Sequence, residues 1–371
     1  MPRPIQAIVH SHALRHNLQQ VTRVVRDTVS PSRVWAVIKA NAYGHGVHTA
    51  VACLNEADGL ALLDLQEAVR AREAGWVKPI LLLEGIFEPG DLDVVQQYRL
   101  TPVVHNLEQL VMLRASNGAP LDVYLKLDTG MTRLGFLPAT VDQAFEQLDA
   151  LVKDKRVGKV TYMTHFACAD QMDGLSEPLQ RFARMTHNRP GNWCLSNSAA
   201  SLMHADQVAA FAAEHGRDIW SRPGICLYGA SPLGDRSAHE LGLMPAMTLR
   251  AEIISVKDVP AGQGIGYGHQ YTAEHDMRVG VVACGYADGY PRHAPTGTPV
   301  AVDGHLTRIL GRVSMDMITV DLSGLPDAHV GSDAVLWGQG GPSVDEVAHA
   351  AGTISYELLS GVTARVPRVV A

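Results

Sequence analysis

The chain has 371 residues, a formal net charge of −7 and 46% hydrophobic residues. This length and apolar content predict a folded protein of two domains and exclude a disordered chain. The mildly acidic balance argues against a protein that binds nucleic acid or an anionic membrane through a basic face.

The five cysteines predict neither a disulfide framework nor a zinc ribbon, because their number is odd, they are widely spaced and no CxxC pair occurs. The first residues lack the apolar stretch of a secretory signal, and the aliphatic run Ile80–Leu83 is too short to span a bilayer. We therefore expect a cytoplasmic protein. His10, His12 and His16 lack a carboxylate in register, so we expect them on a solvated helix face and predict no metal site.

The first part of the chain alternates between short aliphatic runs and helical patterns. A helix is expected over 11–25, where Leu14, Leu18 and Val21 recur at helical spacing. Strands are expected to begin near Val34, Gly59, Pro79, Thr101, Leu121, Val160, Trp193 and Asp218. Helical patterns between them include 65–74, 107–115, 141–152 and 177–187. Eight such units predict a TIM-type (β/α)₈ barrel, a parallel α/β barrel that typically takes about 250 residues.

The pattern changes beyond residue 232. Short β-runs separated by glycine turns are found at 249–256, 277–284, 300–302, 307–310, 318–321 and 334–337. Helical patterns return only at 344–351 and 356–361. We therefore expect a barrel domain over 1–232 and a mostly-β C-terminal domain over 233–371. The strand-like segment within residues 1–9 is a candidate to pair with the second domain.

Polar side chains follow five of the predicted barrel strands, at the end of a barrel where reactions take place. The residues in question are Lys39, Lys126, His165, Ser198 and Arg222. The last two loops, where barrels commonly hold a phosphate, carry Ser198 and the pair Gly224–Ile225. A partly desolvated lysine beside a phosphate cradle indicates covalent binding of pyridoxal phosphate. Taken alone, Lys39 is better explained as a lysine that extends from a strand end into solvent.

The segment Ala36–Gly46, with the sequence AVIKANAYGHG, resembles the cofactor-lysine signature of the alanine racemase family. The resemblance covers nearly the whole chain, in family order, through 126–136, 163–170, 197–200, 222–229, 266–268, 285–292, 311–316 and 356–359. It implies an isomerase that interconverts L-alanine and D-alanine and so supplies or consumes D-alanine.

The resemblance also implies a cofactor, pyridoxal 5′-phosphate, covalently bound to Lys39, which acts as one of two catalytic bases. It assigns the phosphate group to Tyr43, Ser198, Gly224, Ile225 and Tyr356, and it places Arg222 at the pyridine nitrogen. A guanidinium stays protonated, so it cannot accept a proton from the pyridine. The neutral ring is then a weaker electron sink, which disfavours reprotonation at the wrong carbon.

Racemisation requires an acid/base group on each face of the substrate. The resemblance assigns the second group to Tyr267, with His165 and Arg222 forming a hydrogen-bonded chain behind it. In the family this tyrosine comes from the second subunit, together with Met315 and Asp316. The resemblance therefore implies a homodimer with shared active sites.

The remaining expected site residues concern the substrate. By the resemblance, Arg133 and the backbone amide of Met315 bind the substrate carboxylate, and Tyr286 and Arg292 lie at the substrate entrance. The pair is also explained as part of a turn around residues 287–289. Lys126 matches a lysine that is carbamylated in some members of the family, and an ordinary salt bridge to a neighbouring carboxylate is the alternative.

Two alternative functions stay open on the sequence. One is a broad-specificity amino-acid racemase or a fold-related decarboxylase, and the decarboxylase would use another acid in place of Tyr267. The other, from a different class, is a pyridoxal-phosphate-binding protein without turnover. Such a protein would resemble a lone barrel, and the second domain that carries Tyr267 speaks against it.

Overall fold

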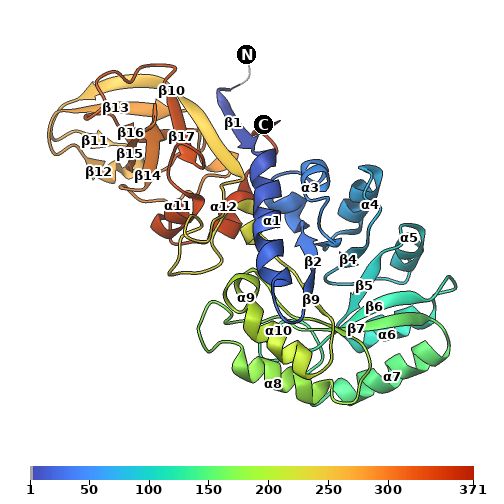
Figure 1. The fold of residues 1–371 in the computed structure, drawn as a ribbon. Helices are drawn as coiled ribbons and strands as arrows, with labels where there is room; N and C mark the ends of the chain where they lie inside the picture. Colours follow the sequence, from blue (N-terminus) through green and yellow to red (C-terminus); the bar gives the residue numbers. More distant parts are fainter. Residues whose placement is uncertain (1–2) are drawn as a thin grey trace.

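A computed structural model describes residues 3–371 as two packed domains (Figure 1). Eight parallel strands close into a barrel, in which each strand pairs with the next along the chain and the last pairs with the first. This arrangement confirms the predicted (β/α)₈ barrel. Its strands are β2 (Ser32–Val37), β3 (Gly59–Leu62), β4 (Ile80–Leu82), β5 (Thr101–Val104), β6 (Leu121–Lys126), β7 (Val157–Met163), β8 (Asn192–Cys194) and β9 (Ile219–Ser221).

Helices cover the outside of the barrel (Figure 1). Because both faces of the barrel sheet are covered by other side chains, most strand residues are buried, as is typical of parallel sheets. The helices of this domain are α1 (Ser11–Arg26), α2 (Lys39–Tyr43), α3 (Val47–Cys53), α4 (Leu65–Glu73), α5 (Asp91–Gln97), α6 (Leu107–Arg114), α7 (Val141–Lys153), α8 (Ser176–Met185), α9 (Ser198–Met203) and α10 (Ala205–Glu214), with the 3₁₀ turn η1 (Ile225–Tyr228).

The second domain is mostly β, as predicted. Its main sheet has the strand order β13-β16-β15-β14-β17-β10-β1-β18, and β10 also pairs with β13, so the sheet folds back on itself. Its strands are β10 (Met247–Val259), β13 (Met277–Val282), β14 (Pro299–Val302), β15 (His305–Leu310), β16 (Ile318–Asp321), β17 (Asp333–Trp337) and β18 (Arg368–Val370). The small hairpin β11 (Gly264–Ile265) and β12 (Tyr271–Thr272), the 3₁₀ turns η2 (Tyr267–His269) and η3 (Tyr286–Asp288), and helices α11 (Val344–Ala350) and α12 (Ser355–Gly361) complete it.

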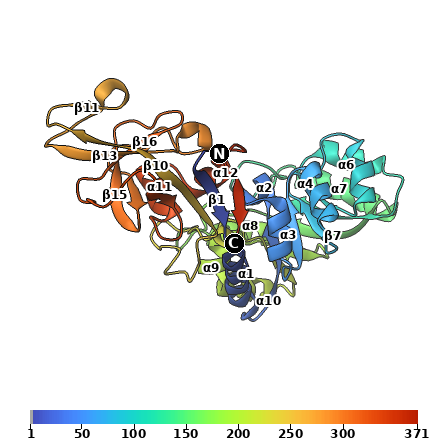
Figure 2. The same ribbon diagram turned by 90° about the horizontal axis from the view of Figure 1, so that it is seen from above.

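Both ends of the chain belong to the second sheet. Strand β1 (Ile5–Val9) pairs antiparallel with β10 and parallel with β18, and the chain then enters the barrel through α1. Seen from above, β1 and α12 lie between the barrel and the far end of the C-terminal sheet (Figure 2). One continuous apolar core runs through both domains. The barrel and the second domain are therefore held together by packing as well as by the connecting chain.

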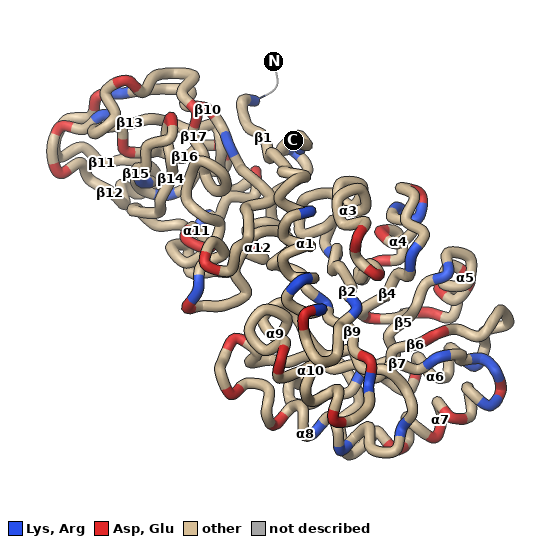
Figure 3. The backbone as a smooth tube through the Cα atoms, viewed as in Figure 1, with Lys and Arg blue, Asp and Glu red and all other residues tan. Residues whose placement is uncertain are grey.

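No helix between residues 3 and 371 is long and apolar enough to cross a membrane. The same residues contain no group of three His, Cys, Asp or Glu side chains placed to hold a metal ion. Acidic and basic residues are interspersed over both domains (Figure 3).

The expectation for His10 was wrong, because it is buried and bonds to Thr248 Oγ1 at 2.8 Å, joining α1 to β10.

Candidate active site

The structure brings four predicted site residues together at the carboxyl ends of the barrel strands. Lys39 follows β2, Lys126 ends β6, His165 follows β7 and Arg222 follows β9. The charges of Lys39, Lys126 and Arg222 all act on His165, so these side chains share one mouth of the barrel. This is the end of a (β/α)₈ barrel at which enzymes of this fold carry their reactive groups.

Lys39 is half-buried at this mouth, and its environment favours the neutral amine. Burial lowers the pKa of Lys39 first, and the positive charge of Arg133 lowers it further. The carboxylate of Glu84 acts in the opposite direction and is the smallest of the three influences. An amine with a lowered pKa is a better nucleophile and proton acceptor near neutrality than an exposed lysine.

Arg222 is buried, and its guanidinium is held by several acceptors. It donates to Thr164 O at 2.7 Å and to Cys194 Sγ at 3.1 Å, and it lies 3.5 Å from His165 Nδ1. Because a guanidinium can only donate, Nδ1 of His165 is the acceptor and the imidazole hydrogen sits on Nε2. Burial and the charge of Arg222 lower the pKa of His165 to about 2, so its imidazole is neutral. The contact with Arg222 thus leaves the Nε2–H of His165 as the ring group that can donate a further hydrogen bond.

Lys126 lies beneath the same mouth and is 6% exposed. Burial, followed by the charges of Arg222 and Arg133, lowers the pKa of Lys126 to about 8. No ion pair joins Lys126 to a carboxylate among residues 3–371. The salt-bridge alternative for this lysine is therefore absent from the part of the chain that the structure describes.

Arg133 reaches the mouth on a loop after β6 that is folded around Asp128. One carboxylate oxygen of Asp128 accepts the backbone amides of Gly130, Met131 and Thr132 at 2.9–3.1 Å. The buried Asp128 carboxylate thus fixes the loop backbone, while the Arg133 side chain remains exposed. An accessible guanidinium on a fixed backbone suits recognition of a carboxylate.

A group of polar atoms beside Lys39 forms a cradle suited to a phosphate. The amide of Gly224 donates to Ser198 Oγ at 2.8 Å. A Cβ at Gly224 would lie 2.6 Å from the Tyr43 hydroxyl, so the close approach requires glycine. Within residues 3–371 the Ile225 amide and the hydroxyls of Tyr43 and Tyr356 have no protein hydrogen-bond partner. Because these three donors lie in one place and have no acceptor among the described residues, they are suited to bind an anionic group.

The segment that joins Lys39 to Tyr43 has an unusual backbone. Residues Ala40, Asn41, Ala42 and Tyr43 have φ between 49° and 55°, so α2 is a left-handed turn rather than an ordinary helix. For residues other than glycine this conformation costs roughly 1–2 kcal/mol each, and strain of this kind clusters at functional sites. Lys39 and Tyr43 stand at the two ends of this strained turn.

Contacts from several elements hold the turn in place. Tyr43 stacks on Tyr228 with ring centroids 4.6 Å apart, and the Tyr228 hydroxyl donates to Val37 O at 2.9 Å. His45 Nδ1 lies 3.1 Å and 2.9 Å from the carbonyl oxygens of Ala42 and Tyr43. Because carbonyls only accept, Nδ1 carries the hydrogen, and burial lowers the pKa of His45 to about 4.

Six of the expected site residues lie on the C-terminal domain: Tyr356 approaches Tyr43 from α12, and the other five are at least partly exposed. Tyr267 is 69% exposed, Met315 is 53% exposed and Tyr286 is 36% exposed. Asp316 and Arg292 are on the same domain, and Asp316 pairs with Arg365. Tyr267 lies between β11 and β12, and β11 is at the end of the domain farthest from the barrel in both views (Figures 1 and 2). A single chain therefore does not bring Tyr267 to Lys39 and His165.

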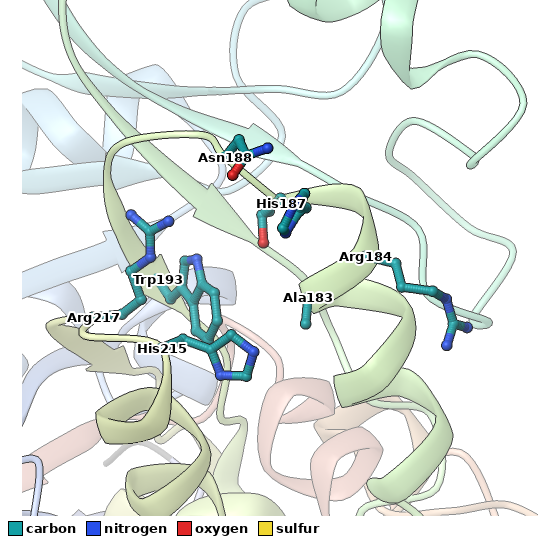
Figure 4. Close-up of a pocket in the computed structure, with 8 residues that line it drawn as sticks. Ala183, Arg184, His187, Asn188, Trp193, His215 and Arg217 are labelled. Atoms are coloured by element: carbon teal, nitrogen blue, oxygen red, sulfur yellow. The ribbon is translucent and has the colours of Figure 1, made fainter.

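Two cavities lie outside the barrel mouth. One, of about 980 Å³, is behind Tyr356 and is lined by 228–239, α11 and the start of α12. The other, of about 580 Å³, is at the opposite end of the barrel, where residues before β8 and β9 surround Trp193 (Figure 4). Arg184, His187, His215 and Arg217 line it, and none of the predicted site residues does. Neither cavity contains the cluster around Lys39.

Two residues that support the site, Tyr228 and Glu67, are not among those predicted from the sequence. Tyr228 lies in the 222–229 motif, where only Arg222, Gly224 and Ile225 were assigned a role. Glu67 accepts the Asn41 amide at 2.6 Å from α4. Asp64 and Glu67 have the spacing of a helix capping box, which is a sufficient reason for a glutamate at position 67. The sequence therefore gives no signal that Glu67 contacts the turn at residues 40–43.

Comparison with known proteins accounts for the entire chain. The family model "Alanine racemase, N-terminal domain" matches residues 9–232, and "Alanine racemase, C-terminal domain" matches residues 246–370. A protein named alanine racemase from Bordetella avium is 54% identical over 99% of both chains, and one from Ralstonia nicotianae is 54% identical over 99% of this chain and 95% of that relative.

Solved structures agree with this assignment. The biosynthetic alanine racemase from Pseudomonas aeruginosa has a TM-score of 0.91 and 45% identity, covering 100% of this chain and 99% of that chain. The alanine racemase from Acinetobacter baumannii has a TM-score of 0.88 and 34% identity, with both chains fully covered. Two family models, full-length relatives at more than half identity and a shared two-domain structure place this chain in the alanine racemase family.

Proposed function

We propose that the protein is a pyridoxal-phosphate-dependent racemase that interconverts L-alanine and D-alanine in the cytoplasm. The observation that carries the proposal is the pairing of Lys39 with a phosphate cradle at one barrel mouth. The amine of Lys39 has a lowered pKa, and the donors of the cradle lie at the other end of the same short turn. Full-length similarity to proteins named alanine racemase supports alanine as the substrate.

The residues present fit the cofactor that this reaction uses. Pyridoxal 5′-phosphate, bound through Lys39, would supply the conjugated ring that stabilises negative charge at the substrate Cα. Its phosphate would be held by Tyr43, Ser198, Gly224, Ile225 and Tyr356. The guanidinium of Arg222, fixed by its bonds to Thr164 and Cys194, would face the pyridine nitrogen as a hydrogen-bond donor.

Racemisation then depends on two proton-carrying atoms on opposite faces of the substrate. Lys39 Nζ, whose lowered pKa favours the neutral amine, takes or gives the Cα proton on one face. Tyr267 Oη does the same on the other face. The Nε2–H of neutral His165, aligned by Arg222, is the donor that would stabilise the tyrosine oxygen when it has lost its proton.

The active protein would be a homodimer in which each site is completed by a second copy of the chain. The support is that Tyr267, Met315 and Tyr286 are exposed on the C-terminal domain, and that the β11 hairpin beside Tyr267 lies at the end of this domain away from the barrel (Figure 2). The backbone amide of Met315 of the second copy would bind the substrate carboxylate together with Arg133, and Asp316 of that copy would lie beside it in the substrate site. Tyr286 and Arg292 of the second copy would line the entrance. Closed two-fold dimers are the commonest way for proteins to share such surfaces.

Lys126 would be carbamylated. Its pKa of about 8 leaves a fraction of the amine neutral at physiological pH, and a neutral amine adds to carbon dioxide with loss of one proton. The product carries a negative charge, which is favoured between Arg222 and Arg133 because both are positive and the site is buried. The carbamate would orient Arg133 toward the substrate carboxylate.

The test combines an absorbance spectrum with a chiral assay. The purified protein should show the visible absorbance of a lysine-bound cofactor, lose it on borohydride treatment, and convert either alanine enantiomer into an equal mixture. Release of carbon dioxide without racemisation would identify a decarboxylase instead. Equal rates on larger side chains would identify a broad-specificity racemase. A bound cofactor with no turnover of any amino acid would identify a non-catalytic binding protein.

A further inference from the structure

Glu67 makes a long-range contact with the strained turn that its position in α4 does not require. It is the third residue after the helix cap Asp64, whose side chain accepts the Glu67 amide at 3.0 Å. A glutamate at this position commonly reaches back to the amide of the cap residue. Here its carboxylate instead leaves α4 and accepts the backbone amide of Asn41 at 2.6 Å.

The Asn41 amide needs this outside partner because its acceptor within the turn is engaged elsewhere. In a continuous helical turn the amide of Asn41 would bond to the carbonyl four residues earlier, which belongs to Val37. That carbonyl accepts the hydroxyl of Tyr228 at 2.9 Å. The following amide, from Ala42, does bond four residues back, to Ile38 O at 2.8 Å. Glu67 thus supplies the acceptor for the Asn41 amide, two residues after Lys39, which has no acceptor within the turn.

The contact is buried and involves a charged acceptor. Glu67 is 7% exposed, and burial raises its pKa while the Asn41 amide lowers it. The nearest cation is Arg70, whose Nη2 is 4.0 Å from the same carboxylate. Removing an acceptor of this kind leaves a buried amide unsatisfied, and hydrogen bonds to charged groups are stronger than those between neutral ones.

We propose that Glu67 is a positioning residue for the cofactor site: it holds the Asn41 peptide in the left-handed conformation and thereby sets the directions of Lys39 and Tyr43. The inference rests on the proposed function. Lys39 and Tyr43 flank the Asn41 peptide within the same five residues, so a change in that peptide moves both the lysine amine and a phosphate ligand. The other anchors, Asn41 Oδ1 on Val47 and His45 on Ala42 and Tyr43, act farther along the chain.

The test compares Glu67→Ala and Glu67→Gln with Glu73→Ala, an exposed glutamate on the same helix. Glu67→Ala should weaken binding of pyridoxal phosphate and lower kcat by about tenfold each, while the KM for alanine changes less than about threefold. Glu67→Gln retains an oxygen acceptor and should recover most of both losses. Glu73→Ala should match the wild-type protein in every measurement.

A second-site change separates positioning from a general structural role. Ala40 is exposed and has a φ of 55°, a conformation that glycine adopts without strain. Ala40→Gly should therefore restore cofactor affinity to a protein that carries Glu67→Ala, because the turn no longer needs the same support. Hydrogen exchange of residues 38–46 in the cofactor-free protein should be faster in Glu67→Ala and return toward wild type in the double variant.

Two results would overturn the proposal. The first is Glu67→Ala behaving like Glu73→Ala in both cofactor affinity and exchange. The second is a loss of thermal stability in Glu67→Ala that Ala40→Gly and Glu67→Gln leave uncorrected, which would mean that Glu67 only stabilises the fold. If Glu67→Ala does not fold, the milder Glu67→Gln with and without Ala40→Gly gives the same comparison. The exchange measurement needs no turnover, so it decides the role of Glu67 even if the wild-type protein fails to racemise alanine.

Discussion

Arg222 shows how one residue sets the protonation state of its neighbours. Its guanidinium has few degrees of freedom because Thr164 O, Leu195 O and Cys194 Sγ all accept from it. Burial is the larger cause of the lowered pKa of His165 and of Lys126, and the charge of Arg222, acting from this fixed position, lowers both further. The two groups serve different ends: a neutral imidazole can relay a hydrogen bond, and an amine with a pKa of about 8 can react with carbon dioxide.

Replacing Tyr267 with phenylalanine tests the two-base assignment. The variant should bind the cofactor normally, because Tyr267 is neither one of the residues of the phosphate cradle nor part of the turn that carries Lys39. It should remove the Cα proton of L-alanine at least about a hundredfold more slowly, while D-alanine, whose proton faces Lys39, keeps exchanging. Deuterium incorporation at Cα measures the two enantiomers separately.

The control for this variant is Tyr271→Phe, on the same hairpin, whose hydroxyl contacts Met277 Sδ inside the domain. It should leave both exchange rates near wild type. Equal losses for L-alanine and D-alanine in Tyr267→Phe would contradict the assignment of one base to each face.

His45 should make the protein less stable in mild acid. Its pKa is lowered from 6.5 to about 4 in the folded state by burial, so between these values the unfolded chain binds a proton that the native protein does not. Its contribution is constant above pH 6.5 and is lost as the pH falls toward 4. Between pH 7 and pH 5 it should reduce the free energy of unfolding by about 2 kcal/mol.

Urea unfolding of the cofactor-free protein at pH 7 and pH 5 measures this effect. Between pH 7 and pH 5 the free energy of unfolding of His45→Gln should fall less than that of the wild-type protein. The difference corresponds to the uptake of nearly one proton when the wild-type chain unfolds. The exposed neighbour variant His48→Gln serves as the comparison and should keep the wild-type dependence. A wild-type dependence in His45→Gln would show that His45 is not buried in the neutral form.

At the scale of elements, the barrel could be predicted because each of its strands is a short aliphatic run whose pattern is local. The eight predicted strand starts all fall in or next to β2–β9, and the predicted 11–25 helix is α1. The left-handed turn 40–43 could not be predicted, because alanine and tyrosine disfavour this conformation and one asparagine, which tolerates it, does not indicate four such residues in a row. Its conformation depends on Glu67, His45 and Tyr228, which are distant in the sequence or have no recognisable pattern.

The site residues likewise divide into those that a local sequence pattern predicts and those that it does not. Lys39, His165 and Arg222 follow strands, so the rule that reactive groups sit at the carboxyl ends of barrel strands already places them together. Tyr267, Met315 and Asp316 lie on exposed segments of the second domain, and no local pattern tells which barrel they face. Their role was available only from the resemblance to the family.

The phosphate cradle can be closed by one methyl group. Gly224→Ala would place a Cβ 2.6 Å from the Tyr43 hydroxyl, so Tyr43 must move out of the cradle. The variant should bind pyridoxal phosphate at least about tenfold more weakly, equivalent to about 1.4 kcal/mol. Absorbance titration of the cofactor-free protein gives the Kd.

Gly234→Ala is the matched control, because a Cβ there meets no atom within 4 Å and the glycine has no left-handed φ. It should bind the cofactor like the wild-type protein. An unchanged Kd for Gly224→Ala would mean that the cradle around Gly224 does not hold the phosphate.

For the whole molecule, the contact between Gly44 and α12 links the lysine turn to the second domain. Gly44 has a φ of 81°, and a Cβ there would lie 2.2 Å from Leu359 O. The Gly44 carbonyl also accepts Arg368 Nε at 2.6 Å, from β18. The turn that carries Lys39 is thus packed directly against the C-terminal domain, so the orientation of the two domains and the cofactor site are set together.

Gly44→Ala should therefore destabilise the protein by at least about 2 kcal/mol more than Gly352→Ala. Gly352 also has a positive φ, of 68°, but a Cβ there has open space, so its variant reports backbone strain alone. Urea unfolding of both variants measures the difference. Equal losses in the free energy of unfolding of the two variants would show that the close contact between Gly44 and α12 does not contribute to stability.

The central claim is that Lys39 of one chain and Tyr267 of another form one active site, and mixing two inactive variants tests it most directly. Lys39→Ala and Tyr267→Ala chains, dissociated together and reassembled, form mixed dimers in which one of the two sites carries both native residues. With random pairing of equal amounts, about a quarter of the wild-type racemase activity should return. Activity no higher than that of the separate variants, with mixed dimers present, would contradict a shared site.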